Sequence, residues 1–181
     1  MASVKKIYLR FFDVYSRFAR RVSSISLVVT YVLLVVVTCI VLLSVFYRYI
    51  LIDPIQWAEE ISRYILIWMT LIAASVAIKE RKHVNLISIL IRLPQRIALL
   101  IDIFFYLIIV LIIGKIVEQS FIMVVTRSVK TLSASLQISM LWAHTALPVG
   151  FGLILIQAFY IILEDIALFI TGESFKEKLG G

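Results

Sequence analysis

The stretch from Val22 to Tyr47 reads VSSISLVVTYVLLVVVTCIVLLSVFY, and no charged residue interrupts it between Arg21 and Arg48. A helix of this length would extend about 39 Å, since each helical residue adds about 1.5 Å. The hydrocarbon core of a bilayer is only about 30 Å thick. The stretch therefore predicts a helix that crosses a membrane.

The composition of the whole chain agrees with this prediction. Of the 181 residues, 62% are hydrophobic, against roughly 45–50% in ordinary globular proteins. Only 16% are charged, against about 25%. A chain of this size has too little interior to hide so much apolar surface, and it is too hydrophobic to stay disordered. We therefore exclude a soluble domain and a disordered chain, and predict an all-α membrane protein.

Three further stretches are apolar and long enough to cross a bilayer. The second begins at Asp53-Pro54, because aspartate caps helices well and proline suits the first helical position. The third is expected to continue as a helix beyond its crossing part, as far as Val125. The fourth is expected to kink at Pro148, which cannot donate a hydrogen bond to the His144 carbonyl. The predicted spans are 22–48, 54–79, 97–117 and 141–163, within a transmembrane domain of 22–170 that a cytoplasmic tail of 171–181 follows.

The distribution of lysine and arginine predicts the orientation of these spans. The chain has 18 Lys+Arg against 11 Asp+Glu, a net charge of +7. Thirteen of the cations fall in the N-terminal segment, the loop between the second and third spans, and the tail, and five fall on the other side. Cytoplasmic segments of membrane proteins collect such cations. Both termini are therefore expected in the cytoplasm, and the positive charge indicates a membrane rather than nucleic acid.

The first 21 residues predict a separate amphipathic helix. Their apolar side chains recur at spacings of three and four, which is one face of a helix, and cations fill the remainder. Such a helix lies in the membrane interface, with its cations among anionic phospholipid head groups. It is either a plain membrane anchor or an arm that also braces another subunit. The cations expected at the lipid interface are Lys5, Lys6, Arg10, Arg17, Arg20 and Arg21.

No catalytic motif is recognisable along the chain. The sequence contains no glycine-rich phosphate loop, no nucleophile elbow and no metalloprotease helix. His83 and His144 are the only histidines, and they fall at opposite ends of different predicted helices, which disfavours a transmembrane haem. Cys39 is the single cysteine and cannot form an internal disulfide. We therefore expect no enzymatic activity, no metal and no cofactor in this chain.

The second span opens with a charged cluster. Glu59, Glu60 and Arg63 are spaced so that one glutamate can pair with the arginine on the same helix. Arg48, at the end of the first span, is the expected partner of the other glutamate. Charged groups within a span need such partners. The cluster is either satisfied within the chain or a docking site for another membrane subunit, with proton coupling as a third alternative.

Small residues follow on the same helix, at Thr70, Ala73, Ala74 and Ala77. They form one close-packing face, which fits packing inside this chain as well as packing on a partner. A transporter needs a polar site near the membrane midplane, and none is visible in the sequence. The chain is therefore expected to be an accessory subunit that supports another protein.

The second span also carries the motif by which the chain resembles a known family. It reads PIQWAEEISRYILIW from Pro54 and AASVAIKERKHV from Ala73, with Leu93-Pro94 ahead of the third span. This motif and the four-span layout resemble the small membrane subunit of tripartite ATP-independent periplasmic (TRAP) transporters, the DctQ-like family. The family typically has glycine before the paired alanines, where this chain has Ile72. The departure suggests a slightly wider packing face.

The resemblance implies a place in a three-part importer of the bacterial inner membrane, driven by a sodium gradient. A periplasmic binding protein would capture an organic acid, such as sialic acid or a C4-dicarboxylate, and a large elevator-type permease subunit would carry the solute. The small subunit would enlarge the fixed scaffold of that large subunit. The residues expected at the subunit interface or in structural roles near it are Trp57, Glu59, Glu60, Arg63, Trp68, Arg48 and His83.

Two other functions remain open at this point. The chain could form a self-sufficient transporter as a homo-oligomer, or it could be a membrane-bound assembly or sensory protein that uses its basic N-terminal helix as a contact.

Overall fold

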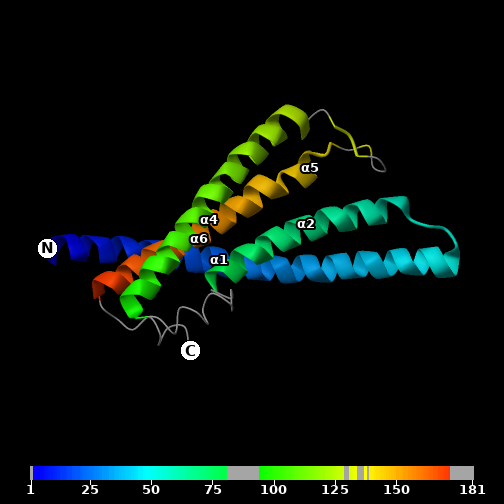
Figure 1. Cartoon of the computed structure of the whole chain (residues 1–181). Coiled ribbons are helices and arrows are strands. Elements are labelled where there is room, and N and C mark those ends of the chain that lie inside the picture. The colour runs from blue at the N-terminus through cyan, green and yellow to red at the C-terminus, as the bar shows by residue number, and fades with distance from the viewer. Residues whose placement is uncertain (1, 81–93, 129–130, 134–136, 138, 172–181) are drawn as a thin grey trace.

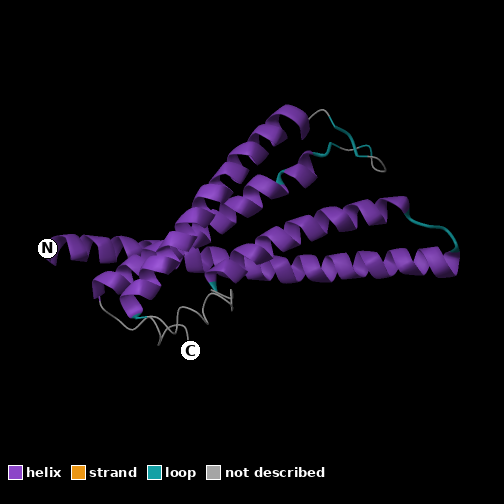
Figure 2. Cartoon of the chain, in the orientation of Figure 1, coloured by secondary structure: helices purple, strands orange, loops and turns teal. Residues whose placement is uncertain are grey.

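The structure, a computed structural model, describes residues 2–80, 94–128, 131–133, 137 and 139–171. These residues are almost entirely helical (Figure 2). The long helices are α1 (Ala2–Phe46), α2 (Gln56–Lys79), α4 (Gln95–Met123) and α6 (Ala146–Thr171), with a short α5 (Leu141–His144) before α6. Two π-helical turns, η1 (Tyr47–Leu51) and η2 (Val124–Ser128), follow α1 and α4. Within this described part, four helical stretches are long and apolar enough to cross a membrane, which confirms the predicted all-α membrane class.

The expected division between an arm helix over 1–21 and a first span is wrong, because α1 runs through Arg21 without a break. No glycine or proline occurs between Ala2 and Phe46, so nothing interrupts the hydrogen bonds from each N–H to the carbonyl four residues earlier. The helix ends where η1 leads into Ile52, whose φ of 56° lies in the left-handed region. The position of residues 1–21 at a lipid surface stays a prediction.

The other predicted ends differ in detail. Helix α2 begins at Gln56, with Ile55 at the cap position, so Asp53 does not cap it as expected. The predicted continuation of the third span is confirmed, since α4 reaches Met123. The fourth span is interrupted at Thr145, between α5 and α6, as the missing donor at Pro148 predicts.

The long helices form two antiparallel pairs (Figure 1). Helices α1 and α2 make the first pair, and α4 and α6 make the second, which crosses the first. Helix α6 packs against all three other long helices. In its apolar window 56% of the residues are buried, against 11% in α1. Helix α6 is therefore the centre of the fold, and α1 lies mostly on its surface.

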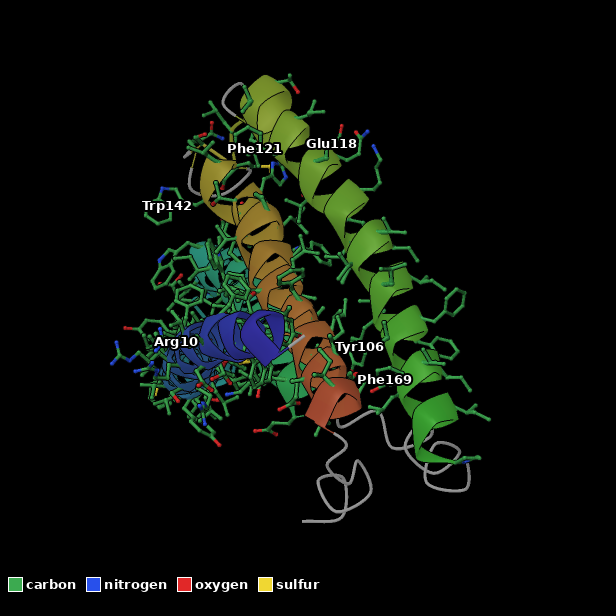
Figure 3. All side chains as sticks on the ribbon, turned by 90° about the vertical axis from the view of Figure 1, so that its left-hand side faces the viewer. Arg10, Tyr106, Glu118, Phe121, Trp142 and Phe169 are labelled. Carbon is green, nitrogen blue, oxygen red and sulfur yellow. The ribbon has the colours of Figure 1, made fainter. Side chains whose placement is uncertain are left out.

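The loop end of the molecule comprises residues 47–55, 131–133 and 139–145, and its terminal end comprises the start of α4 and the last turns of α6. The main buried cluster lies toward the terminal end, where Tyr106 of α4 and Ala19 of α1 meet Tyr160 and Ile161 of α6. Figure 3 shows Tyr106 on the α4 ribbon beside α6, with α1 seen end-on.

Close packing between helices depends on small residues at two places. At Gly150 of α6, an added Cβ would lie 2.5 Å from the Cβ of Leu71 in α2, so only glycine permits this approach. On α1, Ser16, Ala19 and Ser23 are buried against the other helices. Small residues let helix backbones approach closely in membranes.

Candidate functional site

The charged cluster at the loop end contains one ion pair that the sequence predicts. The Arg48 guanidinium in η1 donates to the Glu59 carboxylate in the first turn of α2. Both side chains are about half exposed. The expectation that Arg48 pairs with one of the two glutamates is confirmed. At such exposure the pair contributes at most about 1 kcal/mol to stability.

Glu60 points the opposite way, into the protein, where it is only 6% exposed. Its carboxylate accepts hydrogen bonds from the hydroxyls of Tyr64 and Ser133. Ser133 belongs to the connection between α4 and α6, so Glu60 fastens that connection onto α2. The sequence could have suggested Tyr64, which follows Glu60 by one helical turn, but it gave no signal for Ser133.

The expected pairing of Arg63 with a glutamate is wrong. The Arg63 Nε donates to the backbone carbonyl of Glu59, at 3.3 Å, and the guanidinium makes no ion pair with any residue that the structure describes. The reason is angular, because successive helical residues are turned by about 100°. Glu60 faces the interior, Glu59 is engaged by Arg48, and Arg63 is left on the exposed face of α2.

The tryptophans divide between an internal and an exposed role. The indole N–H of Trp68 donates to the backbone carbonyl of Trp142 at 3.0 Å, which joins α2 to α5. The His144 Nδ1 of α5 lies 2.7 Å from the Ser128 hydroxyl of η2. Trp57 is 40% exposed. Trp68 thus contributes to the fold of this chain, whereas Trp57 stays open to a partner or to lipid.

A second set of hydrogen bonds fastens α1 to α6 near the terminal end. The Tyr8 hydroxyl donates to the Leu163 carbonyl at 2.6 Å, and the Tyr15 hydroxyl donates to the Ile156 carbonyl at 2.9 Å. The Gln157 amide donates to the Ala19 carbonyl at 3.1 Å. Burial, and then the negative charge of Asp165, raise the pKa of Tyr8 to about 12. The predicted apolar face of residues 1–21 therefore packs, in part, on this chain's own α6.

The remaining face of this part of α1 is exposed. The predicted lipid-interface residues Arg10, Arg17, Arg20 and Arg21 all lie there, and Phe11 is 54% exposed beside them. The side chains of Lys5 and Lys6 lie outside the described residues, as does His83.

Acidic side chains buried at the terminal end were not singled out from the sequence. Asp102 of α4 and Asp165 of α6 are at most 3% exposed, and Glu164 accepts a hydrogen bond from the Tyr160 hydroxyl at 2.7 Å. Their signal in the sequence is a charge inside an otherwise apolar span. Among the described residues, no three histidine, cysteine, aspartate or glutamate side chains are arranged to hold a metal ion.

Two grooves border the spans. One, of about 290 Å³, lies between α1 and α2 and includes Tyr31, Ala73 and Ala77 in its lining. The other, of about 600 Å³, follows α4 from Lys115 and reaches Thr126 in η2. The residues that line the first groove come from α1 and the end of α2, and those that line the second come from α4 and η2. Each groove is therefore a depression along the helices.

Comparison with known proteins identifies the family. The sequence profile described as "Tripartite ATP-independent periplasmic transporters, DctQ component" matches residues 37–168, which is most of the chain. The chain therefore belongs to the DctQ component family, and the predicted resemblance is confirmed. It is a multi-pass membrane protein of a transporter family rather than a member of an enzyme family.

Two relatives are similar over shorter stretches. The chain is 26% identical over 129 residues to the sialic acid TRAP transporter small permease protein SiaQ of Vibrio cholerae, covering 71% of this chain and 74% of that protein. It is 29% identical over 116 residues to the isethionate TRAP transporter permease protein DctMQ of Oleidesulfovibrio alaskensis. That match covers 61% of this chain and 17% of the relative, so most of DctMQ lies outside it.

Proposed function

We propose that this chain is the small membrane subunit of a TRAP importer in a bacterial inner membrane and that it forms a stationary scaffold for the large permease subunit. The observation that carries the proposal is the fastening of the helix pairs to each other at two levels. Glu60 and Trp68 join α2 to the residues before α6 at the loop end, and Tyr8, Tyr15 and Gln157 join α1 to α6 near the terminal end.

Such fastening suits a body that does not change shape during transport. Packed helices move relative to one another only when their side-chain contacts have an alternative arrangement. Hydrogen bonds to buried groups are costly to leave unmade, and more so where water is absent. An elevator-type large subunit needs a stationary surface against which its transport part moves, and a rigid four-span protein would extend that surface in the membrane plane.

The wider assignment draws on the relatives. One belongs to a sialic acid system and the other to an isethionate system, so the solute of this transporter is an organic acid. A sodium gradient would drive uptake, and a periplasmic binding protein would deliver the solute to the large subunit. Both termini would face the cytoplasm. The exposed cations of α1, from Arg10 to Arg21, would bind anionic phospholipids there, where each contributes about 1 kcal/mol.

Reconstitution tests the proposal. Proteoliposomes would contain this chain alone, the large permease subunit alone, or both, with the binding protein and an inward sodium gradient. We expect uptake of the organic acid only when both membrane subunits are present. Uptake by this chain alone would overturn the scaffold assignment and favour the homo-oligomeric transporter. Uptake by the large subunit alone at the full rate would show that no scaffold is needed.

A further inference from the structure

One face of α2 has the pattern of a helix-packing seam, and several of its positions are exposed in the part of the chain that the structure describes. Positions 63, 66, 70, 73, 77 and 80 follow one another at spacings of three and four, which is the heptad pattern of helices that pack side by side. Of these, Arg63, Thr70 and Ala77 are exposed, whereas Ile72 and Ser75 on the opposite face are buried. We call this face the α2 seam. It consists of Arg63, Leu66, Thr70, Ala73, Ala77 and Glu80.

The α2 seam borders a groove whose lining includes two of the small side chains of α2. Ala73, Ala77 and Glu80 line the groove of about 290 Å³, together with Thr30 and Tyr31 of α1. A groove with alanine and threonine on its walls lets another helix backbone approach closely. Contact with lipid chains does not require small side chains, whereas interfaces between membrane helices are enriched in them.

The charge on the α2 seam indicates what covers it. Arg63 is exposed on a spanning helix and makes no ion pair within the part of the chain that the structure describes. Charged side chains in spans are almost always paired, so a carboxylate is expected opposite Arg63. A second copy of this chain in the same membrane orientation would instead bring a second Arg63 toward the first, which like charges oppose.

We propose that the α2 seam receives one transmembrane helix of the large permease subunit, with a carboxylate of that helix opposite Arg63. The inference rests on the proposed function and adds the contact face to it. The seam extends from Arg63 to Glu80, about 26 Å, which is nearly the thickness of the hydrocarbon core and so the length of one crossing helix. In DctMQ, a DctQ-like stretch belongs to the same polypeptide as a much longer remainder.

Site-specific photocross-linking tests the proposal in the assembled complex. A photoreactive benzoylphenylalanine would replace Thr70 or Ala77, and in a matched control it would replace Leu111 of α4, which is 63% exposed on another helix. The chain would be co-expressed with its epitope-tagged large permease subunit and irradiated in native membranes. We expect an adduct that carries the tag from positions 70 and 77, about tenfold stronger than from position 111.

The other outcomes are distinguishable. A tagged adduct from position 111 alone would overturn the α2 seam and leave the scaffold function standing. An adduct of two copies of this chain from positions 70 and 77 would assign the seam to a homodimer. No tagged adduct, together with no co-purification of the unsubstituted chain with the large subunit, would overturn the proposed function itself. Normal co-purification with no protein adduct from either seam position would assign the seam to lipid.

Substitutions give a second measurement that does not depend on cross-linking. Arg63→Glu would place an acid opposite the expected carboxylate and is expected to reduce co-purification with the large subunit about tenfold, whereas Arg63→Lys retains most of it. Ala77→Trp would fill the groove, which Ala77 lines, and act in the same direction. Gly114→Leu is the control, since a Cβ at Gly114 of α4 meets no atom within 4 Å. Full recovery of the complex with both Arg63→Glu and Ala77→Trp would contradict the proposal.

Discussion

Helices α1 and α6 are both long and apolar, yet they lie in opposite surroundings. Helix α6 is largely buried among the other helices, whereas α1 is mostly exposed. The buried helix is nevertheless the less hydropathic of the two. It also holds the buried side chains of Gln157, Glu164 and Asp165. In this molecule the inside is therefore more polar than the lipid-facing surface.

The difference follows from the solvent. Lipid chains offer no hydrogen-bond partner, so a polar side chain in a span is least costly where another helix supplies one. Gln157 donates to the Ala19 carbonyl of α1, whereas Glu164 accepts from the Tyr160 hydroxyl on its own helix. Apolar side chains gain little from leaving lipid for protein, because both are equally apolar. Polarity and small size, rather than hydropathy, thus indicate which helix is central.

The largest expected effect concerns the packing of α6 on α2. Gly150→Ala would place a Cβ 2.5 Å from the Cβ of Leu71, and the resulting separation of the helices should cost up to about 3 kcal/mol. Gly152→Ala is the matched control on the same helix, since its Cβ meets no atom within 4 Å. Thermal unfolding in detergent measures both. Equal stability of the two variants would show that α6 is not closely packed at Gly150.

The next effect contrasts a buried with an exposed glutamate on one helix. Glu60→Ala leaves the hydroxyls of Tyr64 and Ser133 without their acceptor, at an expected cost of about 2 kcal/mol. Glu59→Ala removes only the exposed pair with Arg48 and should cost less than about 1 kcal/mol. Amide hydrogen exchange at residues 131–133 measures how firmly this connection is held on α2. If the Glu59 variant were the less stable, the assignment of Glu60 as the fastening residue would fail.

A smaller effect tests how firmly α1 is held to the central helix. Tyr15→Phe removes the hydrogen bond to the Ile156 carbonyl, and such bonds between membrane helices contribute about 0.6 kcal/mol on average. Tyr31 lies on the same helix and is 60% exposed, so Tyr31→Phe should change nothing measurable. Chemical unfolding of both variants in the same detergent gives their free energies of unfolding. An equal loss of stability in Tyr31→Phe would show that the Tyr15 hydrogen bond does not hold α1 to α6.

The smallest effect appears only in alkali. The pKa of Tyr8 is raised to about 12 in the folded protein, above the usual value of 10.0. The neutral hydroxyl is thus favoured by folding, so its contribution is fully present below pH 10 and is lost as the pH rises toward 12. The difference in tyrosinate absorbance between the unsubstituted chain and Tyr8→Phe should titrate in that range. A midpoint at or below pH 10 would contradict the burial of Tyr8 against α6.

Much of the fold was predictable because it depends on neighbours in the sequence. The four spans follow from uninterrupted apolar length, and the interruption at Thr145 follows from Pro148. The first 21 residues are not separate from the first span, because a change in amphipathic pattern does not end a helix when no glycine or proline interrupts its backbone bonds. In the charged cluster, the partner of Arg48 was predictable, but the inward turn of Glu60 was not.

By itself, the sequence determined the membrane class, the approximate spans and the family motif around α2, since each depends on transfer to lipid and on bonds between residues a few positions apart. Only the tertiary structure decided that α6 is central, that Glu60 binds Ser133 and that Arg63, Thr70 and Ala77 of the α2 seam are exposed. These features depend on which helix faces meet. A rotation of about 100° separates adjacent residues, so small differences in helix packing decide which side chains are buried and which remain for a partner.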